Sequence, residues 1–286
     1  MKVLLTGANG QLGNCFQDRL PTGWELWATD SDVLDITDLA KVKSVVGNYL
    51  PDVIINAAAY TAVDKAEVDY EAAALINELG PKNLALAANE VNARLVHVST
   101  DYVFDGNANV PYIETAVTNP LSVYGKTKLD GEIAVIHIQP NALIIRTAWV
   151  FSEYGNNFVK TMLRLAQDRD TLGIVSDQFG CPTYAGDIAE AIILLLQRKA
   201  TGGIYHFCGD ETVAWNEFAE AIFSSALKQG VLKKLPLING ITTVQYPTPA
   251  QRPKYSVLNC EKIKNQGVVL SSWRKRIDEI ITASLK

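Results

Sequence analysis

The stretch of sequence that decides the fold reads Thr6-Gly7-Ala8-Asn9-Gly10-Gln11-Leu12-Gly13. It follows a short apolar run, residues 2–6, and opens a segment long enough for a helix, residues 11–20. A glycine-rich turn in this place lets the backbone approach a pyrophosphate, and the helix N-terminus adds free N–H groups and the positive end of its dipole. The G-x-x-G-x-x-G spacing of Gly7, Gly10 and Gly13 predicts dinucleotide binding, with a purely structural turn as the alternative.

An acidic residue, Asp30, ends the next apolar run, residues 25–29. In dinucleotide-binding units a carboxylate in this place accepts hydrogen bonds from the adenosine ribose. It would also repel a 2′-phosphate, and no arginine lies nearby to offset that repulsion. The sequence therefore favours NADH over NADPH, unless Asp30 simply ends a strand.

Short apolar runs alternate with helical segments through the first half of the chain, and the runs are typical of buried parallel strands. Repeated alternation of this kind predicts an α/β fold, a doubly wound parallel sheet of the Rossmann type with ligands at the carboxyl ends of the strands. The predicted strands are Lys2–Thr6, Glu25–Thr29, Val53–Asn56, Leu95–Ser99 and Leu143–Arg146. The predicted helices are Gln11–Leu20, Asp38–Tyr49, Tyr70–Val91 and Tyr124–His137.

The pattern changes after about residue 150. Helical segments continue at 157–167, 184–197 and 215–228, but strands between them are sparse. The last third is expected to be mostly loop because four prolines break it up: Pro236, Pro247, Pro249 and Pro253.

This change divides the chain into two lobes. We predict a dinucleotide-binding domain over residues 1–150 and a smaller C-terminal substrate-binding cap formed mainly by residues 151–286. Residues 203–207 look like another strand of the sheet, so part of 181–207 is expected to return to the first domain.

The composition excludes several classes of function. The chain has 286 residues, is 48% apolar and 20% charged, and carries a net charge of −5, which argues against binding to nucleic acid because that rests on clustered Lys and Arg. The longest apolar stretch, residues 191–196, is too short to span a membrane, and the N-terminus lacks the features of a signal peptide. No cysteines or histidines have metal-ligand spacing. We expect a cytoplasmic protein without a metal.

A tyrosine and a lysine, Tyr124 and Lys128, are spaced to lie on one face of a helix. A phenol has a pKa of about 10 and is a poor acid at neutral pH, but a nearby ammonium lowers that pKa. Ketone reduction needs such an acid, because hydride addition creates an alkoxide that must be protonated. The pair alone is more typical of a surface helix.

A hydroxyl residue, Thr100, lies where the fourth predicted strand meets the carboxyl edge of the sheet. There it can donate a hydrogen bond to a substrate carbonyl and polarise it; a strand-end cap is the alternative. The combination of nucleotide turn, strand-end hydroxyl and Tyr/Lys helix predicts a nicotinamide-dependent reductase with Tyr124, Lys128 and Thr100 as catalytic residues.

Eight stretches together are similar to one known family; they span roughly residues 1–255 and comprise 6–13, 56–67, 99–104, 124–128, 146–150, 155–158, 177–180 and 252–253. On these stretches the sequence resembles the extended short-chain dehydrogenase/reductase superfamily, in its nucleotide-sugar-modifying branch. Within that branch it is most similar to the reductases that act on dTDP-4-dehydro-β-L-rhamnose. The resemblance implies a dTDP-sugar substrate and either NADH or NADPH as cofactor.

The resemblance also implies a set of cofactor-binding residues. The set comprises Gly7, Gly10, Gln11, Leu12, Gly13, Asp30, Asp35, Ile36, Ala59, Tyr60, Thr61, Tyr124 and Lys128. In this set Gln11 and Leu12 hold the pyrophosphate, Asp35 and Ile36 flank the adenine, and Lys128 binds the nicotinamide ribose besides tuning the pKa of Tyr124.

For the substrate, the resemblance implies contacts of Thr100 and Asp101 with the sugar and of Trp149 near it. Arg252 would meet the diphosphate, since a planar guanidinium suits phosphate oxygens. A core tryptophan and an exposed structural arginine are the alternatives. Part of the family forms metal-bridged dimers through acidic residues of the first helix; residues 11–17 contain none, so a homodimer stays open and no metal is carried over.

Three other functions stay open. A 4-ketoreductase of another deoxysugar or an epimerase would share the fold and the Tyr/Lys pair. A 4,6-dehydratase is disfavoured, because that enzyme uses an Asp-Glu pair after the strand-end threonine, whereas here Tyr102 follows Asp101. A non-catalytic, dinucleotide-binding regulatory subunit could also retain Tyr124 and Lys128.

Overall fold

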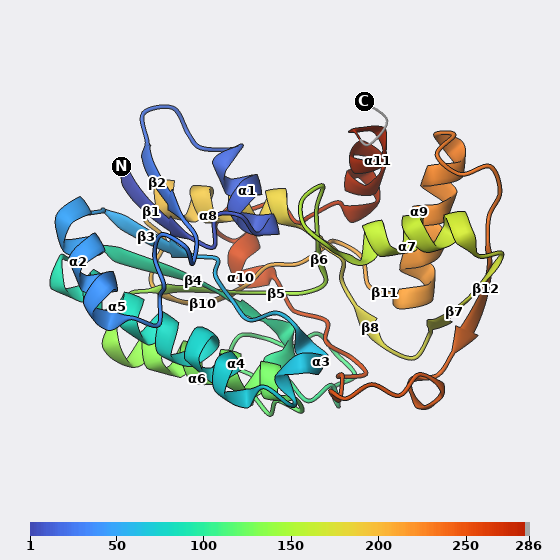
Figure 1. Cartoon of the computed structure of the whole chain (residues 1–286), viewed down its shortest axis with the longest axis horizontal. Coiled ribbons are helices and arrows are strands. Elements are labelled where there is room, and N and C mark those ends of the chain that lie inside the picture. Colours follow the sequence, from blue (N-terminus) through green and yellow to red (C-terminus); the bar gives the residue numbers. More distant parts are fainter. Residues whose placement is uncertain (284–286) are drawn as a thin grey trace.

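Six parallel strands form one sheet in the larger lobe, in the spatial order β10-β5-β4-β3-β1-β2 (Figure 1). The structure is a computed structural model, in which residues 1–283 are described. The chain order reverses between β1 and β3, and ligands of doubly wound sheets bind at the carboxyl ends of the strands beside such a reversal. The strands are β1 (Lys2–Thr6), β2 (Glu25–Thr29), β3 (Val53–Asn56), β4 (Arg94–Thr100), β5 (Leu143–Thr147) and β10 (Gly203–His206).

The predicted fold class and strands are confirmed. β1, β2 and β3 match their predicted ranges, and β4 and β5 extend only slightly beyond theirs. The strand expected at 203–207 is β10, which pairs with β5 at the edge of the sheet. Strands buried on both faces are near-continuous apolar runs, which explains why their ends could be located from sequence.

Helices cover both faces of the sheet. α1 (Gln11–Gln17) and α8 (Ala185–Gln197) pack together over one face, around Phe16 and Ile188. α2 (Leu39–Tyr49), α5 (Gly80–Glu90) and α6 (Val123–Ile138) cover the other, where the core includes Val46, Leu84 and Val135.

The single helix predicted over Tyr70–Val91 is wrong in its middle. It is divided into α4 (Tyr70–Ala74), a π-helical turn η1 (Leu75–Leu79) and α5. Pro81 lacks the N–H that would bond to the carbonyl of Asn77 in a regular α-helix. The buried Asn77 side chain instead bonds to the backbone N–H of Tyr60 (2.8 Å) and to its carbonyl oxygen (3.1 Å). Tertiary contacts of this kind favour a π-bulge and cannot be read from local periodicity.

The smaller lobe has its own core, formed by α7 (Phe158–Asp168), α9 (Trp215–Lys228) and α11 (Trp273–Ala283) around Phe218. A parallel pair of strands, β7 (Thr171–Val175) and β12 (Leu237–Ile241), flanks these helices. The expectation that the last third is mostly loop is therefore wrong for β12 and α11. In α11, Trp273, Ile277 and Ile281 are buried on one face, so the basic residues 274–276 lie within an amphipathic helix.

Short elements complete the chain: α3 (Val63–Ala66), η2 (Asp101–Val103), β6 (Val150–Phe151), β8 (Phe179–Gly180), β9 (Thr183–Tyr184), β11 (Val213–Ala214), η3 (Thr243–Gln245) and α10 (Glu261–Lys264). Among residues 1–283 there is no helix whose length and apolar character would let it cross a membrane.

Candidate active site

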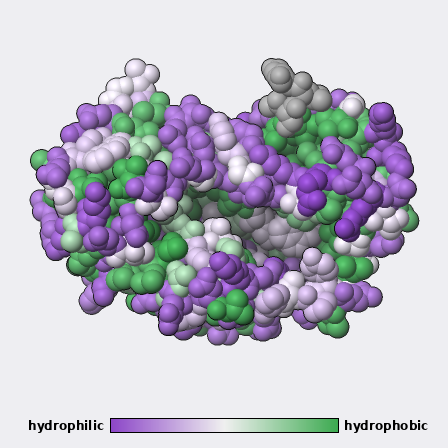
Figure 2. Space-filling model, in the orientation of Figure 1, coloured by the Kyte–Doolittle hydropathy of each residue, from purple (hydrophilic) through white to green (hydrophobic). Residues whose placement is uncertain are grey.

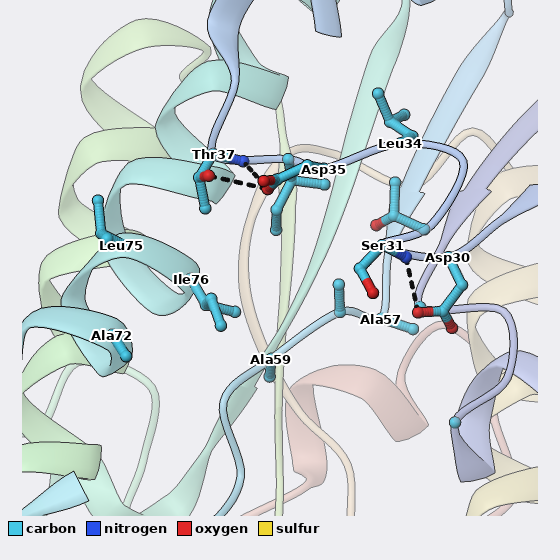
Figure 3. Close-up of a pocket in the computed structure, with 15 residues that line it drawn as sticks. Asp30, Ser31, Leu34, Asp35, Thr37, Ala57, Ala59, Ala72, Leu75 and Ile76 are labelled. Carbon is cyan, nitrogen blue, oxygen red and sulfur yellow. Dashed lines mark hydrogen bonds between the residues drawn. The ribbon is translucent and has the colours of Figure 1, made fainter. Parts of the chain in front are cut away.

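A cavity of 530 Å³ lies at the carboxyl ends of β1, β2 and β3 (Figure 3). It is lined by several residues that were predicted to bind a cofactor: Gly7, Gly10, Asp30, Asp35, Ile36 and Ala59. The predicted residues Gln11, Leu12, Gly13, Tyr60, Thr61, Tyr124 and Lys128 do not line it. The structure therefore brings together the residues predicted for the adenosine end of the site. The other predicted residues lie outside this cavity.

Sequence reasoning missed much of the cavity wall. Ala72, Leu75 and Ile76 reach it from α4 and η1, on the side opposite Asp30 and Ser31 (Figure 3). The other missed residues are Thr6, Ser31, Leu34, Thr37, Ala57 and Ala58. Ser31, Ala57 and Ala58 could have been identified because they directly follow predicted strand ends, whereas the helical residues carry no sequence signal.

The glycine turn leaves no space for side chains. Gly7 has a φ of +70°, and a Cβ there would lie 2.6 Å from the backbone nitrogen of Ala58. A Cβ on Gly13 would lie 2.2 Å from the carbonyl oxygen of Gly7. Gly7 thus lets two strand ends approach each other, and Gly13 lets α1 start directly against the turn. Leu12 and Gly13 are buried and support the turn from below.

The side chain of Gln11 connects the turn to the smaller lobe. Its Oε1 accepts hydrogen bonds from Ser152 Oγ (2.9 Å) and Asn157 Nδ2 (3.0 Å). Nearby, the Tyr154 hydroxyl donates to Asp18 at the end of α1 (2.8 Å). The Gln11 side chain is therefore engaged across the lobes, and its contribution to a pyrophosphate site would be its backbone N–H.

Asp30 occupies the predicted position after β2. One of its carboxylate oxygens accepts from the N–H of Asn9 (2.9 Å) and the other from the N–H of Ser31 (2.7 Å). Asp35 Oδ1 accepts from the backbone and hydroxyl of Thr37 (2.9 and 2.8 Å; Figure 3). The lining of the cavity contains two carboxylates and no lysine or arginine.

The segment after β3 is held in place by hydrogen bonds of Tyr60. Tyr60 donates its backbone N–H to Asn77 Oδ1 and its hydroxyl to Asp69 (3.0 Å), while Thr61 is exposed. Asn77 Nδ2 also donates to Thr127 Oγ1 on α6 (3.2 Å). The π-helical turn therefore joins the segment expected to hold the cofactor to the helix that carries Tyr124.

The start of α6 lies against the turn that follows β4. A Cβ on Gly125 would lie 2.2 Å from the carbonyl oxygen of Tyr102, so Gly125 permits the approach. Ser122 caps the helix by accepting from the N–H of Gly125 (3.1 Å), and Glu67 accepts from the N–H of Val123 (2.9 Å). These contacts bring Tyr124 beside the end of β4, as predicted.

Tyr124 differs electrostatically from the prediction. Burial raises its pKa to about 12, the Thr100 hydroxyl lowers the pKa, and the Asp101 carboxylate raises it. Lys128 Nζ donates instead to the carbonyl oxygen of Val98 (2.6 Å), and burial lowers the Lys128 pKa to about 8. The Tyr124 pKa is therefore not lowered as predicted: burial is its largest influence, and the Lys128 ammonium is held on the backbone of β4.

Thr100 and Asp101 are both buried, with 5% and 2% of their surfaces exposed. Thr100 Oγ1 lies 3.1 Å from Asp101 Oδ1 and 3.2 Å from the N–H of Tyr102. The ring of Tyr102 packs edge-on against that of Tyr124, with 5.5 Å between the centroids. A hydroxyl, a carboxyl and a phenol thus meet at the carboxyl end of β4.

Trp149 stacks on Trp215, with ring centroids 3.4 Å apart and planes within 6°. Trp215 and Arg252, together with Gln178, line a second cavity of 290 Å³ in the smaller lobe. Trp149 does not line this cavity and contacts it only through Trp215. Trp215 was missed by the sequence reasoning.

Arg252 forms a two-pronged ion pair with Asp64 of α3, with nitrogen–oxygen distances of 3.1 and 2.7 Å. It also donates to Thr248 Oγ1. An arginine has five N–H donors, so this pairing leaves capacity for an anion. The face between the two lobes is hollowed (Figure 2).

A Rossmann-type sheet, a glycine turn at its switch point and a Tyr124/Lys128 helix beside Thr100 define a member of the short-chain dehydrogenase/reductase class. The chain belongs to the dTDP-4-dehydrorhamnose reductase family of oxidoreductases: the family model described as RmlD substrate binding domain matches residues 1–285.

Curated relatives agree along the whole chain. It is 47% identical to a dTDP-4-dehydrorhamnose reductase of Aggregatibacter actinomycetemcomitans, over 98% of both chains. It is 43% identical to that of Salmonella typhimurium, over 99% of this chain and 97% of the other.

Solved structures agree as well. A reductase of this name from Clostridium acetobutylicum has a TM-score of 0.94 and 42% identity over 100% of both chains. One from Bacillus anthracis, in complex with NADP, has a TM-score of 0.93 and 37% identity over 99% of both chains.

Proposed function

We propose that this protein reduces dTDP-4-dehydro-β-L-rhamnose to dTDP-β-L-rhamnose with NADH or NADPH. The observation that carries the proposal is the meeting of Tyr124 and Thr100 at the end of β4, the strand next to β3, because residues that follow β3 line a cavity together with the glycine turn. The names of the curated relatives support the substrate.

The residues around the 530 Å³ cavity fit a dinucleotide. Gly7 and Gly10 of the turn line this space, and the N-terminus of α1 offers N–H groups to a pyrophosphate. In this proposal Gly10, Gln11 and Leu12 hold the pyrophosphate, Asp30 the ribose, and Asp35 with Ile36 the adenine. Ala59, Tyr60 and Thr61 would line the path toward Lys128.

Both nicotinamide cofactors belong in the proposal. The carboxylate of Asp30 disfavours a 2′-phosphate, whereas the Bacillus anthracis relative was solved with NADP. The hydroxyl of Ser31 in the same cavity offers a hydrogen bond that suits a ribose with or without a 2′-phosphate.

The bound nicotinamide would supply hydride to C4 of the sugar. Tyr124, whose pKa is raised by burial, keeps its proton at neutral pH and would donate it from the phenol oxygen to the alkoxide that forms. Thr100 would orient the carbonyl by a hydrogen bond. Lys128 would hold the nicotinamide ribose from its place on the Val98 carbonyl.

The smaller lobe would hold the nucleotide part of the substrate. The second cavity offers the aromatic rings of Phe158 and Trp215 and the amide of Gln178, which suit a nucleobase, and Arg252 for the diphosphate. Trp149 would support Trp215. We accordingly propose residues 1–150, with α8 and β10 from 181–207, as the dinucleotide-binding domain and the rest of 151–286 mainly as the substrate-binding domain.

The test is to follow NADH and NADPH absorbance with purified protein and dTDP-4-dehydro sugars. One cofactor oxidised per sugar reduced is expected with dTDP-4-dehydro-β-L-rhamnose. Turnover of sugar without cofactor consumption would favour an epimerase or dehydratase, and preference for another sugar a different ketoreductase. No oxidation with any sugar, together with copurification of a larger enzyme, would favour the regulatory subunit.

A further inference from the structure

Asp101 lies directly behind the hydroxyl that is proposed to orient the substrate carbonyl. Only 2% of the residue is exposed. Its Oδ1 is 3.1 Å from Thr100 Oγ1, which donates to it. The same Thr100 oxygen accepts from the N–H of Tyr102 (3.2 Å).

The Thr100 hydroxyl has one proton to donate and two lone pairs to accept with. While Asp101 is a carboxylate it can only accept, so the Thr100 proton is used in the bond to Oδ1. Thr100 then has nothing to donate to a carbonyl. When Asp101 is a neutral acid, the carboxyl proton can be donated to Thr100 Oγ1 instead. The Thr100 proton is then free to point toward the substrate.

The surroundings of Asp101 shift its titration toward the neutral acid. Burial raises its pKa to about 6, against the opposing effect of the Ser256 and Thr100 hydroxyls. The Asp101 charge raises the pKa values of three neighbouring titratable groups: Tyr102 on η2, Tyr124 on α6 and Cys181 between β8 and β9. None of the three is a cation, and a bound sugar would remove further water from the carboxyl, which raises its pKa again.

We propose that Asp101 is a positioning residue: its neutral form turns the Thr100 hydroxyl toward the substrate carbonyl, and its carboxylate form turns that hydroxyl away. The inference rests on the proposed reductase function. It gives Asp101 a role through Thr100 in addition to the direct sugar contact that the family resemblance implies.

The experiment compares the pH dependence of kcat for the wild type, Asp101→Asn and Thr100→Val, at pH values below about 8, where Lys128 keeps its proton. The wild-type kcat should fall by about tenfold per pH unit above the pKa of Asp101, the slope of one titrating group. In Asp101→Asn the amide can donate to Thr100 Oγ1 at every pH, so this decline should disappear. In Thr100→Val the decline should also disappear, at a lower rate throughout, because the hydroxyl it acts through is gone.

The same decline in the wild type and in Thr100→Val would overturn the proposal, even if Asp101→Asn failed to fold. A readout independent of turnover is the infrared carbonyl stretch of a neutral carboxylic acid. It should appear in the wild type with dTDP-β-L-rhamnose at pH values below the pKa of Asp101 and be missing in Asp101→Asn. Its absence from the wild type would also overturn the proposal, whereas a wild type that reduces no dTDP-4-dehydro sugar would refute the proposed function.

Discussion

The Nζ of Lys128 donates a hydrogen bond to the carbonyl oxygen of Val98, 2.6 Å away, which holds a buried ammonium on the backbone of β4. Burial lowers the Lys128 pKa to about 8, while Glu132, one helical turn further on, raises it. Lys128 is therefore fully protonated well below pH 8 and loses its charge as the pH rises through that value.

We expect cofactor binding to weaken above pH 8, since a neutral amine is a poorer donor to the nicotinamide ribose. In Lys128→Met the affinity should be low and independent of pH in this range. The measurement is the KM and the fluorescence-titrated Kd for NADH between neutral pH and pH values above 8. Lys126→Met is the matched control, because Lys126 is exposed on the same helix and pairs with Asp130; if it lost the pH dependence equally, Lys128 would not be its source.

Tyr124→Phe should lose at least ~10²-fold in kcat, because general acid catalysis contributes about 10²–10⁴-fold. NADH binding should stay within a few-fold of the wild type, since the ring remains to pack against Tyr102. Tyr205→Phe, another buried tyrosine whose hydroxyl bonds to the carbonyl of Thr201, serves as control and should keep its rate. A Tyr124→Phe rate within a few-fold of the wild type would remove Tyr124 from the mechanism.

Asp30→Asn should shift cofactor preference toward NADPH. The change removes the charge that repels a 2′-phosphate and weakens hydrogen bonds to the ribose, and hydrogen bonds to charged groups contribute about 1.5–3 kcal/mol. We expect the ratio of kcat/KM for NADPH over NADH to rise about tenfold or more. Asp32→Asn, an exposed change in the same segment, should leave the ratio unchanged; equal ratios in all three proteins would exclude Asp30 from cofactor selection.

Two glycine substitutions should act in opposite directions on stability. Gly13→Ala places a Cβ 2.2 Å from the carbonyl oxygen of Gly7 and should lower the free energy of unfolding by about 1–3 kcal/mol, with loss of NADH binding. Gly47→Ala lies on α2 with nothing within 4 Å of its Cβ, and should raise that free energy by roughly 0.5–1 kcal/mol. Urea unfolding measures both; a stable Gly13→Ala that binds NADH would show that the turn relaxes.

The parts of this fold that can be predicted from sequence are those that depend on residues close together in the chain. The strands were located because runs such as Val53–Asn56 are apolar on both faces. The positions of Gly7, Asp30 and Thr100 followed because each stands where a predicted strand ends. Their meeting at one edge then follows from the topology of parallel sheets.

The rest depends on partners distant in sequence. The π-helical turn at Asn77 exists because its side chain bonds to Tyr60 and Thr127. Trp149 is placed by stacking on Trp215, and the pKa of Tyr124 is set by how deeply α6 is buried against β4. None of these is encoded in the spacing of nearby residues.

Gln11 belongs to the turn proposed to bind the pyrophosphate, and its side chain is held by Ser152 and Asn157 of the other lobe. A dinucleotide that binds this turn would therefore restrain the smaller lobe through these contacts before any sugar arrives. We expect compulsory-order kinetics in which the dinucleotide enters first and leaves last, and in Gln11→Ala this order should give way to random entry.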